Sequence, residues 1–207
     1  TKKRIINVVC DTVILGKNIT SGEVVCLDPD SNPRYVGVDP DNYVSFNGNR
    51  WRIIGKFNGQ IKLVDYYSEW IEGYWNAPWG TSDKQLELNN ETDGYITTID
   101  STSYSYVDLN HTWNIGAYSS YDNLSRINLY QSERGNTPVE GSSDVTWQGA
   151  IGLLYSSDIE YSTVDEGDYN RGWILNQSME YVWTMTTYID GGPDFYDPVH
   201  MCPMSYR

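Results

Sequence analysis

The segment DPDSNPRYVGVD, which starts at Asp28, places oxygen-bearing side chains at a spacing that a hard cation can use. Asp28, Asp30 and Asn32 stand at alternate positions, and Asp39 ends the segment. Such oxygens can wrap a calcium ion. However, Pro33 stands where a helix–loop–helix calcium loop has glycine. Two Asp-Pro turns around a surface loop are the alternative interpretation, which is favoured because short motifs often match by chance.

The three cysteines offer two other kinds of site. Cys10 and Cys26 flank a turn-rich segment, and a disulfide between them would contribute about 3 kcal/mol in the loop-entropy model. Cys202 lies two residues from His200, and this pair with the other cysteines could complete a tetrahedral zinc site. No C-x₂-C spacing is present, so a disulfide with one unpaired thiol is preferred over zinc. Three buried thiols remain a further alternative.

Side chains for catalysis do not form a recognisable set. The only histidines are His111 and His200, and no G-x-S-x-G nucleophile motif is present. A Cys202–histidine pair stays open, as does a carboxylate pair for glycoside cleavage, for which EWIEGYW at 69–75 is the best candidate. No glycine-rich phosphate loop occurs, which argues against phosphate cofactors. We therefore expect no enzyme, with a secreted hydrolase as one alternative.

Aromatic side chains gather between residues 66 and 80 and offer a possible ligand site. Trp70, Tyr74, Trp75 and Trp79 could stack on sugar rings, which would make the chain a carbohydrate-binding module. The alternative is a core-and-rim cluster that closes one end of a sheet, and this is the favoured interpretation.

Composition and charge limit the classes of protein. The 207 residues include 18 tyrosines and 8 tryptophans but only 3 phenylalanines, as in extracellular modules with half-exposed aromatic surfaces. The net charge is −14, and no lysine or arginine occurs from residue 85 to 125, so a nucleic-acid partner is not expected. No apolar run could form a transmembrane segment. The N-terminal TKKRIINVV is not a signal peptide, although a leader could precede Thr1.

The segment NYVSFNGNRWRIIGKFNGQIKLV at 42–64 predicts the centre of the fold. Two Asn-Gly pairs divide it into strands near 43–46, 50–57 and 60–64, a three-stranded antiparallel meander. In its middle strand Trp51, Ile53 and Phe57 share one face, which we expect to be the core face. The basic residues are expected on the opposite face, as a solvated strip that pairs with acidic loops of this chain or of a neighbour: Arg50, Arg52, Lys56 and Lys62.

The other elements are expected to be short. Strands are predicted at 4–9 and 22–26, and a buried strand at 149–158. Helices are predicted after an N-cap at Thr81 or Ser82, and from Asp122 to a stop at Gly135. The fold class is therefore α+β, with a mainly antiparallel sheet, a central meander and long loops. We expect a single domain, 1–207, in which a turn-rich segment at 1–40 precedes the main body at 41–207.

Several motifs resemble an uncharacterised extracellular domain family of Firmicutes and other gut bacteria. The block YVSFNGNRWRIIG is similar to the family's opening, and the likeness continues at LELNN, TWNIG, SERG, IGLLYSSDIEYS and YVWTM. It covers most of the chain from about residue 35 onward. The family's usual Arg-Pro near the end is replaced here by Cys202-Pro203. The resemblance implies a head domain of pilin-like or surface-anchored proteins with a C-type-lectin-like fold, and it implies no catalytic residues.

These observations predict a non-enzymatic module at the bacterial cell surface. It would be a pilin-like subunit or adhesin head that acts in filament assembly or in attachment to a host or surface. Its partners would be other subunits of the assembly or a host or glycan ligand. The alternatives are a carbohydrate-binding module that uses the 70–79 aromatics, and the secreted hydrolase.

Overall fold

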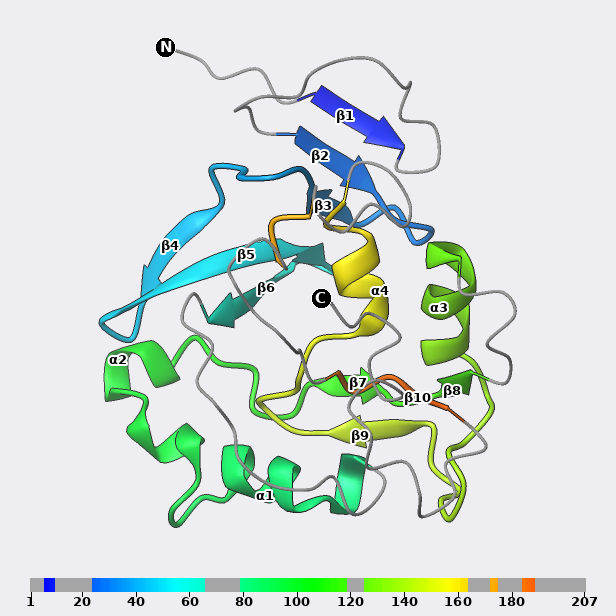
Figure 1. The fold of residues 1–207 in the computed structure, drawn as a ribbon. Helices are drawn as coiled ribbons and strands as arrows, with labels where there is room; N and C mark the ends of the chain where they lie inside the picture. Colours follow the sequence, from blue (N-terminus) through cyan, green and yellow to red (C-terminus); the bar gives the residue numbers. More distant parts are fainter. Residues whose placement is uncertain are drawn as a thin grey trace, which may run out of the picture. The chain divides into compact units, whose positions relative to one another are not determined.

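A computed structural model of the chain describes residues 6–9, 24–65, 79–118, 125–163, 172–174 and 184–188 (Figure 1). The chain divides into two compact units, each built from two segments. Unit 1 comprises Thr1–Ser68 and Ser157–Met179, and unit 2 comprises Glu69–Ser156 and Glu180–Arg207. The boundary expected at residue 40 falls inside unit 1. Antiparallel sheets and a few short helices make this an α+β fold, as the sequence predicts.

Unit 1 is built on a six-stranded sheet. Its strands are β1 (Ile6–Val9), β2 (Val24–Leu27), β3 (Pro33–Tyr35), β4 (Tyr43–Phe46), β5 (Asn49–Phe57) and β6 (Gln60–Asp65). The order is β1-β2-β3-β5-β4, and β6 also pairs with β5. β1 lies parallel to β2, and the remaining pairs of this sheet are antiparallel.

The meander of β4, β5 and β6 confirms the strands predicted from the two Asn-Gly pairs. Asn47 and Gly48 have φ of 51° and 72°, and Asn58 and Gly59 have φ of 48° and 89°. Positive φ at both central residues is the geometry of a two-residue turn that matches the twist of the flanking strands. Asparagine and glycine adopt it at low cost, so the local sequence fixes both hairpins.

The predicted distribution of the β5 side chains between core and solvent is wrong in part. Arg52 and Ile54 are each only 2% exposed, so the face expected to be solvated is the more buried one here. Trp51, Ile53 and Phe57, expected in the core, are half-buried. Alternation along a strand separates two faces but does not say which face is covered. Two other basic residues of β5 are exposed as predicted: Arg50 and Lys56.

The second segment of unit 1 supplies a short helix, α4 (Ser156–Glu160), whose residues from Ser157 onward belong to this unit. The predicted strand over 149–158 is wrong: within it only Leu154 forms an isolated bridge, with Thr184, and the chain turns helical from Ser156. The amide of Gly37 donates to the carbonyl of Ser162 at 3.0 Å, and the indole of Trp173 donates to the carbonyl of Tyr35 at 2.9 Å. The buried apolar residues of unit 1 are Cys26, Val36, Ile54, Ile159, Tyr161, Trp173 and Ile174.

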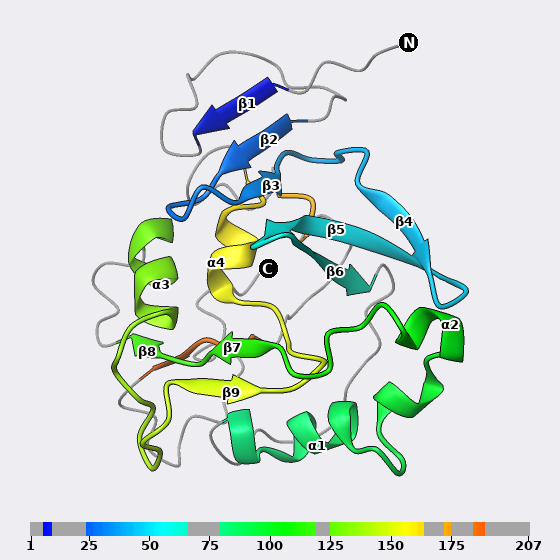
Figure 2. The same cartoon turned by 180° about the vertical axis from the view of Figure 1, so that it is seen from behind.

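Unit 2 combines short helices with two small sheets. The helical elements are η2 (Trp79–Thr81), α1 (Asp83–Asn89), η3 (Tyr95–Thr98), α2 (Ser101–Tyr104) and α3 (Arg126–Glu133). The strands are β7 (Thr112–Asn114), β8 (Ala117–Tyr118), β9 (Thr146–Gln148) and β10 (Thr187–Tyr188). β7 and β9 are antiparallel, a pairing visible from behind in Figure 2, and β8 and β10 are parallel. The core cluster contains Trp79, Trp113, Ile115, Tyr155 and Met185.

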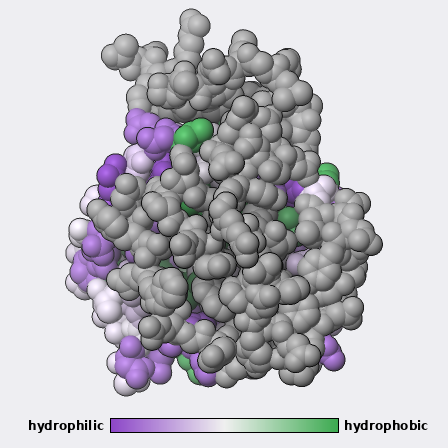
Figure 3. All heavy atoms as spheres, viewed as in Figure 1, coloured by the Kyte–Doolittle hydropathy of each residue, from purple (hydrophilic) through white to green (hydrophobic). Residues whose placement is uncertain are grey.

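Local capping chemistry explains where the longer helices begin. Ser82 caps α1 and accepts from the amide of Gln85 at 3.1 Å, as predicted. The predicted helix over 122–135 appears as α3, with Ser125 as its N-cap, while Asp122 lies outside the described residues. None of the helices in the described ranges is long and apolar enough to cross a membrane. On the face seen in Figure 3, the described residues are mostly hydrophilic and the apolar ones form isolated spots.

Gly55 is where β3 and β5 approach most closely, and its replacement gives the first prediction. A Cβ at this position would lie 2.5 Å from the carbonyl oxygen of Pro33. Gly55→Ala should therefore lower the free energy of unfolding by about 1–3 kcal/mol, measured by urea denaturation. Ser45→Ala, at an exposed position of β4, is the control and should change it little; equal effects of the two variants would contradict the prediction.

The second prediction concerns Asp100, the N-cap of α2. The Ser103 hydroxyl, and then the Ser103 amide, hold the pKa of Asp100 below its ordinary value of 3.8. Because the folded-state pKa is lowered, the contribution of this cap to stability is present above pH 3.8 and is lost as the pH falls through the lowered pKa. Carboxyl NMR titration should show this lowered pKa, and Ser103→Ala should raise it, whereas Thr98→Ala should leave it where it is. An unchanged pKa in Ser103→Ala would contradict the assignment.

Candidate functional site

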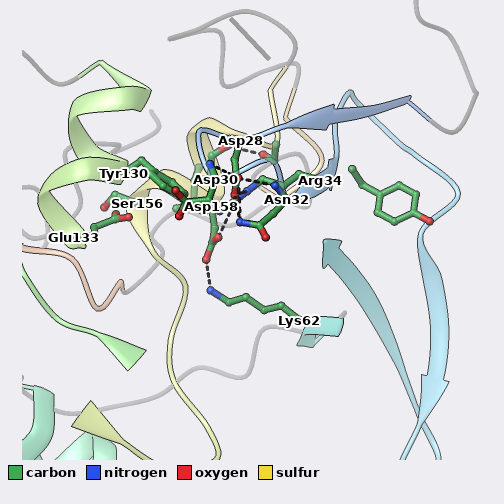
Figure 4. A network of polar contacts seen from close by, with 12 residues as sticks. Asp28, Asp30, Asn32, Arg34, Lys62, Tyr130, Glu133, Ser156 and Asp158 are labelled. Carbon is green, nitrogen blue, oxygen red and sulfur yellow. Dashed lines mark hydrogen bonds and ion pairs between the residues drawn. The ribbon is translucent and has the colours of Figure 1, made fainter. Parts of the chain in front are cut away.

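A buried cluster of charged side chains is the most distinctive polar feature of unit 1 (Figure 4). Arg34 of β3 lies between two carboxylates: its Nε is 2.8 Å from Asp28 Oδ2, and its Nη1 is 2.7 Å from Asp158 Oδ1. Lys62 of β6 completes the cluster, with Nζ 2.5 Å from Asp158 Oδ2. The side chains of Arg34, Asp28 and Asp158 are 1%, 0% and 0% exposed, so solvent does not screen these pairs.

The turn that follows β2 holds Asp28 in position. Its Oδ1 accepts from the amides of Asp30 and Asn32 at 3.0 and 2.9 Å, and the Asn32 side-chain amide donates to both carboxylate oxygens. Ser31 adopts a positive φ of 64°, which tightens the turn. Aspartate and asparagine favour such turns because their short side chains bond to nearby backbone amides. The Asp28 carboxylate is thus fully engaged by donors from its own turn and by Arg34.

Two carboxylates keep the buried guanidinium charged, and aromatic rings flank it. The guanidinium carbon of Arg34 lies 4.7 Å from the ring centre of Phe57 and 5.3 Å from that of Tyr161. Burial by itself lowers the pKa of Arg34, but the charges of Asp158 and Asp28 outweigh it, and the pKa lies above its ordinary value. Because the pKa of Arg34 is higher in the folded chain than in the unfolded chain, the charged guanidinium stabilises the fold at every pH below the ordinary pKa of arginine.

This geometry does not support the predicted calcium loop. Asp28 directs its oxygens to Arg34 and to amide donors, so a cation there would have to displace an arginine. Asp39 belongs to a different set of contacts, since its Oδ1 accepts from the Tyr43 hydroxyl at 2.7 Å and from Arg52 Nη2 at 3.2 Å. Within the ranges that the structure describes, no group of three or more His, Cys, Asp or Glu side chains could hold a metal ion. The segment is an ion-paired turn.

A second arginine cluster in unit 1 alternates guanidinium groups with aromatic rings. The guanidinium carbon of Arg50 lies 3.9 Å from the ring centre of Tyr43, and that of Arg52 lies 4.4 Å from the same ring. Arg52 also lies 4.4 Å from the ring centre of Trp173. A cation placed over an aromatic face is attracted by the ring quadrupole, most strongly where water is excluded. The stack therefore fixes the orientation of β4 against β5.

Hydrogen bonds complete the environment of the buried Arg52. Its Nε donates to Asn42 Oδ1 at 2.8 Å, and its Nη2 donates to the carbonyl of Pro40 at 3.1 Å. The Asn42 side-chain amide donates in turn to the carbonyl of Ile53 at 2.7 Å. The sequence pattern predicts Arg52 in solvent, which is wrong, and gives no signal for Asn42 or Trp173. The register of the β4–β5 hairpin could have indicated the contact between Arg52 and an aromatic ring, because it sets Tyr43 directly opposite Arg52.

Unit 2 has a buried polar cluster of its own around Glu133, at the end of α3. Glu133 is 1% exposed; its Oε1 accepts from the Thr186 hydroxyl at 2.6 Å and its Oε2 from Arg134 at 3.1 Å. The amide of Ser156 donates to the Thr186 hydroxyl at 2.8 Å. The guanidinium carbon of Arg134 lies 3.5 Å from the ring centre of Tyr130. The acid is thus buried and bonded on both oxygens inside the unit.

Of the four residues of the predicted aromatic ligand site, the structure describes only Trp79. Trp79 is 1% exposed and packs edge-on against Trp147, with ring centres 5.7 Å apart. Trp79 therefore belongs to the core of unit 2, as the favoured core-and-rim interpretation expects, and it does not serve the alternative role of stacking on a sugar ring. Trp70, Tyr74 and Trp75 lie outside the described residues.

The predicted cysteine and histidine sites are described only in part. Cys26 is buried and disulfide-bonded, so it cannot act as a thiolate ligand for zinc. Its predicted pairing with Cys10 stays a prediction, because Cys10 lies outside the described residues, as do Cys202, His200 and the segment at 69–75. His111 is half-buried, with Nδ1 3.5 Å from Asp108 Oδ2 and its ring edge-on to Trp113.

Comparison of the chain with protein-family models, with curated proteins and with solved structures gives no match. The resemblance to the Firmicutes domain family therefore stays a prediction from its motifs. The buried clusters of both units bind their acids to internal donors, so these acids organise the fold.

The third prediction tests the Arg34 cluster. Arg34→Met would leave two carboxylates buried without their cation, and it should lower the free energy of unfolding by about 3–5 kcal/mol, measured by denaturant titration. Lys56→Met, at an exposed position of the same sheet, is the matched control and should change it by less than about 0.5 kcal/mol. A loss for Arg34→Met that is no larger than the control's would show that the cluster does not hold the fold.

Proposed function

We propose that this chain is a non-enzymatic module at the bacterial cell surface, a pilin-like subunit or adhesin head that acts in filament assembly or attachment. The observation that carries the proposal is the engagement of the buried acids. Asp28, Asp158 and Glu133, three of the buried acids of the described ranges, are bonded to cations or hydroxyls of their own unit. A hydrolase needs such groups in contact with substrate.

The disulfide at Cys26 supports an extracellular location. Disulfides persist in oxidising environments such as the bacterial surface and are rare where thiols are kept reduced. The net charge of −14 and the many tyrosines fit a protein that works in solvent and makes contacts through aromatic surface residues. The partners in this proposal are other protein subunits of a surface assembly or a host ligand.

The proposal includes a C-type-lectin-like fold for the Trp-bearing part of the chain. Its support is the pairing of β7 with β9, which sets Trp113 opposite Trp147 in a small antiparallel sheet. The carbohydrate-binding alternative has lost Trp79 to the core, and its other three residues lie outside the described ranges. We therefore place protein contacts first among the modes of attachment.

The fourth prediction tests location and assembly in the native bacterium. Surface biotinylation of intact cells should label the chain, and size fractionation of the released material should place it in an assembly larger than a monomer. A cytoplasmic marker protein is the control for cell integrity. Recovery of the chain only inside the cells, or only as a monomer without surface labelling, would overturn the proposed function.

A further inference from the structure

The tripeptide Phe-Asn-Gly occurs twice in the chain, and each copy forms the tip of a hairpin of unit 1. Asn47-Gly48 joins β4 to β5, and Asn58-Gly59 joins β5 to β6. An asparagine that precedes glycine is prone to lose its side-chain amide, because glycine has no side chain to hinder attack by its own backbone nitrogen. Since both asparagines lie between the same two residue types, a difference in their reactivity must come from the fold.

The reaction needs only water as a second reactant. The backbone nitrogen of the glycine bonds to the side-chain carbonyl carbon of the asparagine, and the side-chain nitrogen leaves as ammonia with the proton of that backbone amide. Water then opens the resulting succinimide ring at either carbonyl and gives aspartate or isoaspartate. In isoaspartate the main chain runs through the former side chain and is longer by a methylene group. The ring can close only where the asparagine can turn toward the following amide.

The Asn47 hairpin is braced on both faces of its strands. The ring of Phe46 packs edge-on against Trp51, with ring centres 5.8 Å apart, and the guanidinium carbon of Arg50 lies 3.9 Å from the ring centre of Tyr43. Alternation along the strands places these two contacts on opposite faces, and both join β4 to β5. Asn47 itself is half-buried. Opening this turn would break these contacts, so the ring-closing geometry is reached rarely.

The Asn58 hairpin is open to solvent at its tip. Asn58 is exposed, and so are Lys56 and Ile61, which lie opposite each other where the two strands approach the turn. Phe57 contacts the guanidinium of Arg34 at the base of the turn, with 4.7 Å from the guanidinium carbon to the ring centre. The residues beyond that anchor can therefore rearrange at lower cost than those of the first hairpin.

We propose that Asn58 is a site of spontaneous deamidation and that the fold protects Asn47 from the same reaction. The chemistry is intramolecular succinimide formation followed by hydrolysis. The proposal goes beyond the proposed function and does not depend on it, because it follows from two identical tripeptides in different surroundings.

Isoaspartate at Asn58 would disturb the register of β6. That register depends on a two-residue turn with positive φ, 48° at Asn58 and 89° at Gly59, into which a longer backbone does not fit. Lys62 follows on β6, and its Nζ lies 2.5 Å from Asp158 Oδ2 in the buried cluster. A displaced β6 weakens this ion pair, so the modification couples the age of the protein to the stability of unit 1.

The fifth prediction compares the two asparagines in one sample. The folded chain is incubated in mildly alkaline buffer, and peptide mapping by mass spectrometry follows deamidation and isoaspartate at both sites. Asn58 should react about tenfold or more faster than Asn47. In the chain unfolded in urea the two rates should be similar. Equal rates in the folded chain, a faster reaction at Asn47, or no reaction at Asn58 while the unfolded chain reacts would overturn the proposal.

A variant of the first hairpin tests the protection directly. Arg50→Ala removes the contact over Tyr43 and should raise the rate at Asn47 about twofold to fivefold, with no change at Asn58. Ser45→Ala, directly opposite Arg50 and also exposed, is the matched control and should leave both rates unchanged. An unchanged rate at Asn47 in Arg50→Ala would show that these contacts do not protect it and would overturn that part of the proposal.

The structural consequence has its own control. The isoaspartyl form, separated by ion-exchange chromatography, should unfold at a lower urea concentration than the unaltered chain. Asn58→Asp carries the same added charge without the longer backbone and should stay close to the unaltered chain. An isoaspartyl form as stable as Asn58→Asp would overturn the predicted effect on β6.

Discussion

The enclosure of Arg34 between Asp28 and Asp158 is the constraint on which unit 1 depends. Taking a guanidinium out of water costs several kcal/mol, which is offset only when the carboxylates and the remaining donors are well placed. Asp28 comes from the turn before β3, whereas Asp158 is 124 residues further along the chain than Arg34. The ion pair therefore requires the second segment of unit 1 to bring Asp158 to one position beside the sheet. Apolar contacts alone would define that position less sharply.

Both units place arginine side chains in their interiors or against aromatic rings. Arginines lie against aromatic rings and acids inside the fold, as Arg34, Arg52 and Arg134 show. Only 14 lysines and arginines stand against 28 acids in the chain, and the fold draws several of these cations into its interior or against its rings. Several of the chain's few basic side chains are therefore committed to contacts inside the fold.

Local chemistry made part of this structure predictable. The Asn-Gly turns of the meander and the Ser82 cap depend on the backbone preferences of a few adjacent residues, which the sequence displays directly. The burial of Arg52 was missed because alternation separates two faces without saying which one another segment covers. The pairing of Arg34 with Asp158 was missed because contacts between distant residues leave no local pattern. The aspartates after β2 lie in a turn, the favoured of the two interpretations of that segment, and the cation that Asp28 meets is the guanidinium of Arg34.

The stack of Tyr43 with Arg50 and Arg52 shows how one interaction can order the elements that supply it. Tyr43 belongs to β4 and both arginines belong to β5, so the guanidinium groups reach the ring only when the two strands pair. Trp173, from the second segment of unit 1, extends the stack. Because a cation over an aromatic face is attracted most strongly where water is excluded, the segment that covers Arg52 also strengthens the contact that aligns the hairpin.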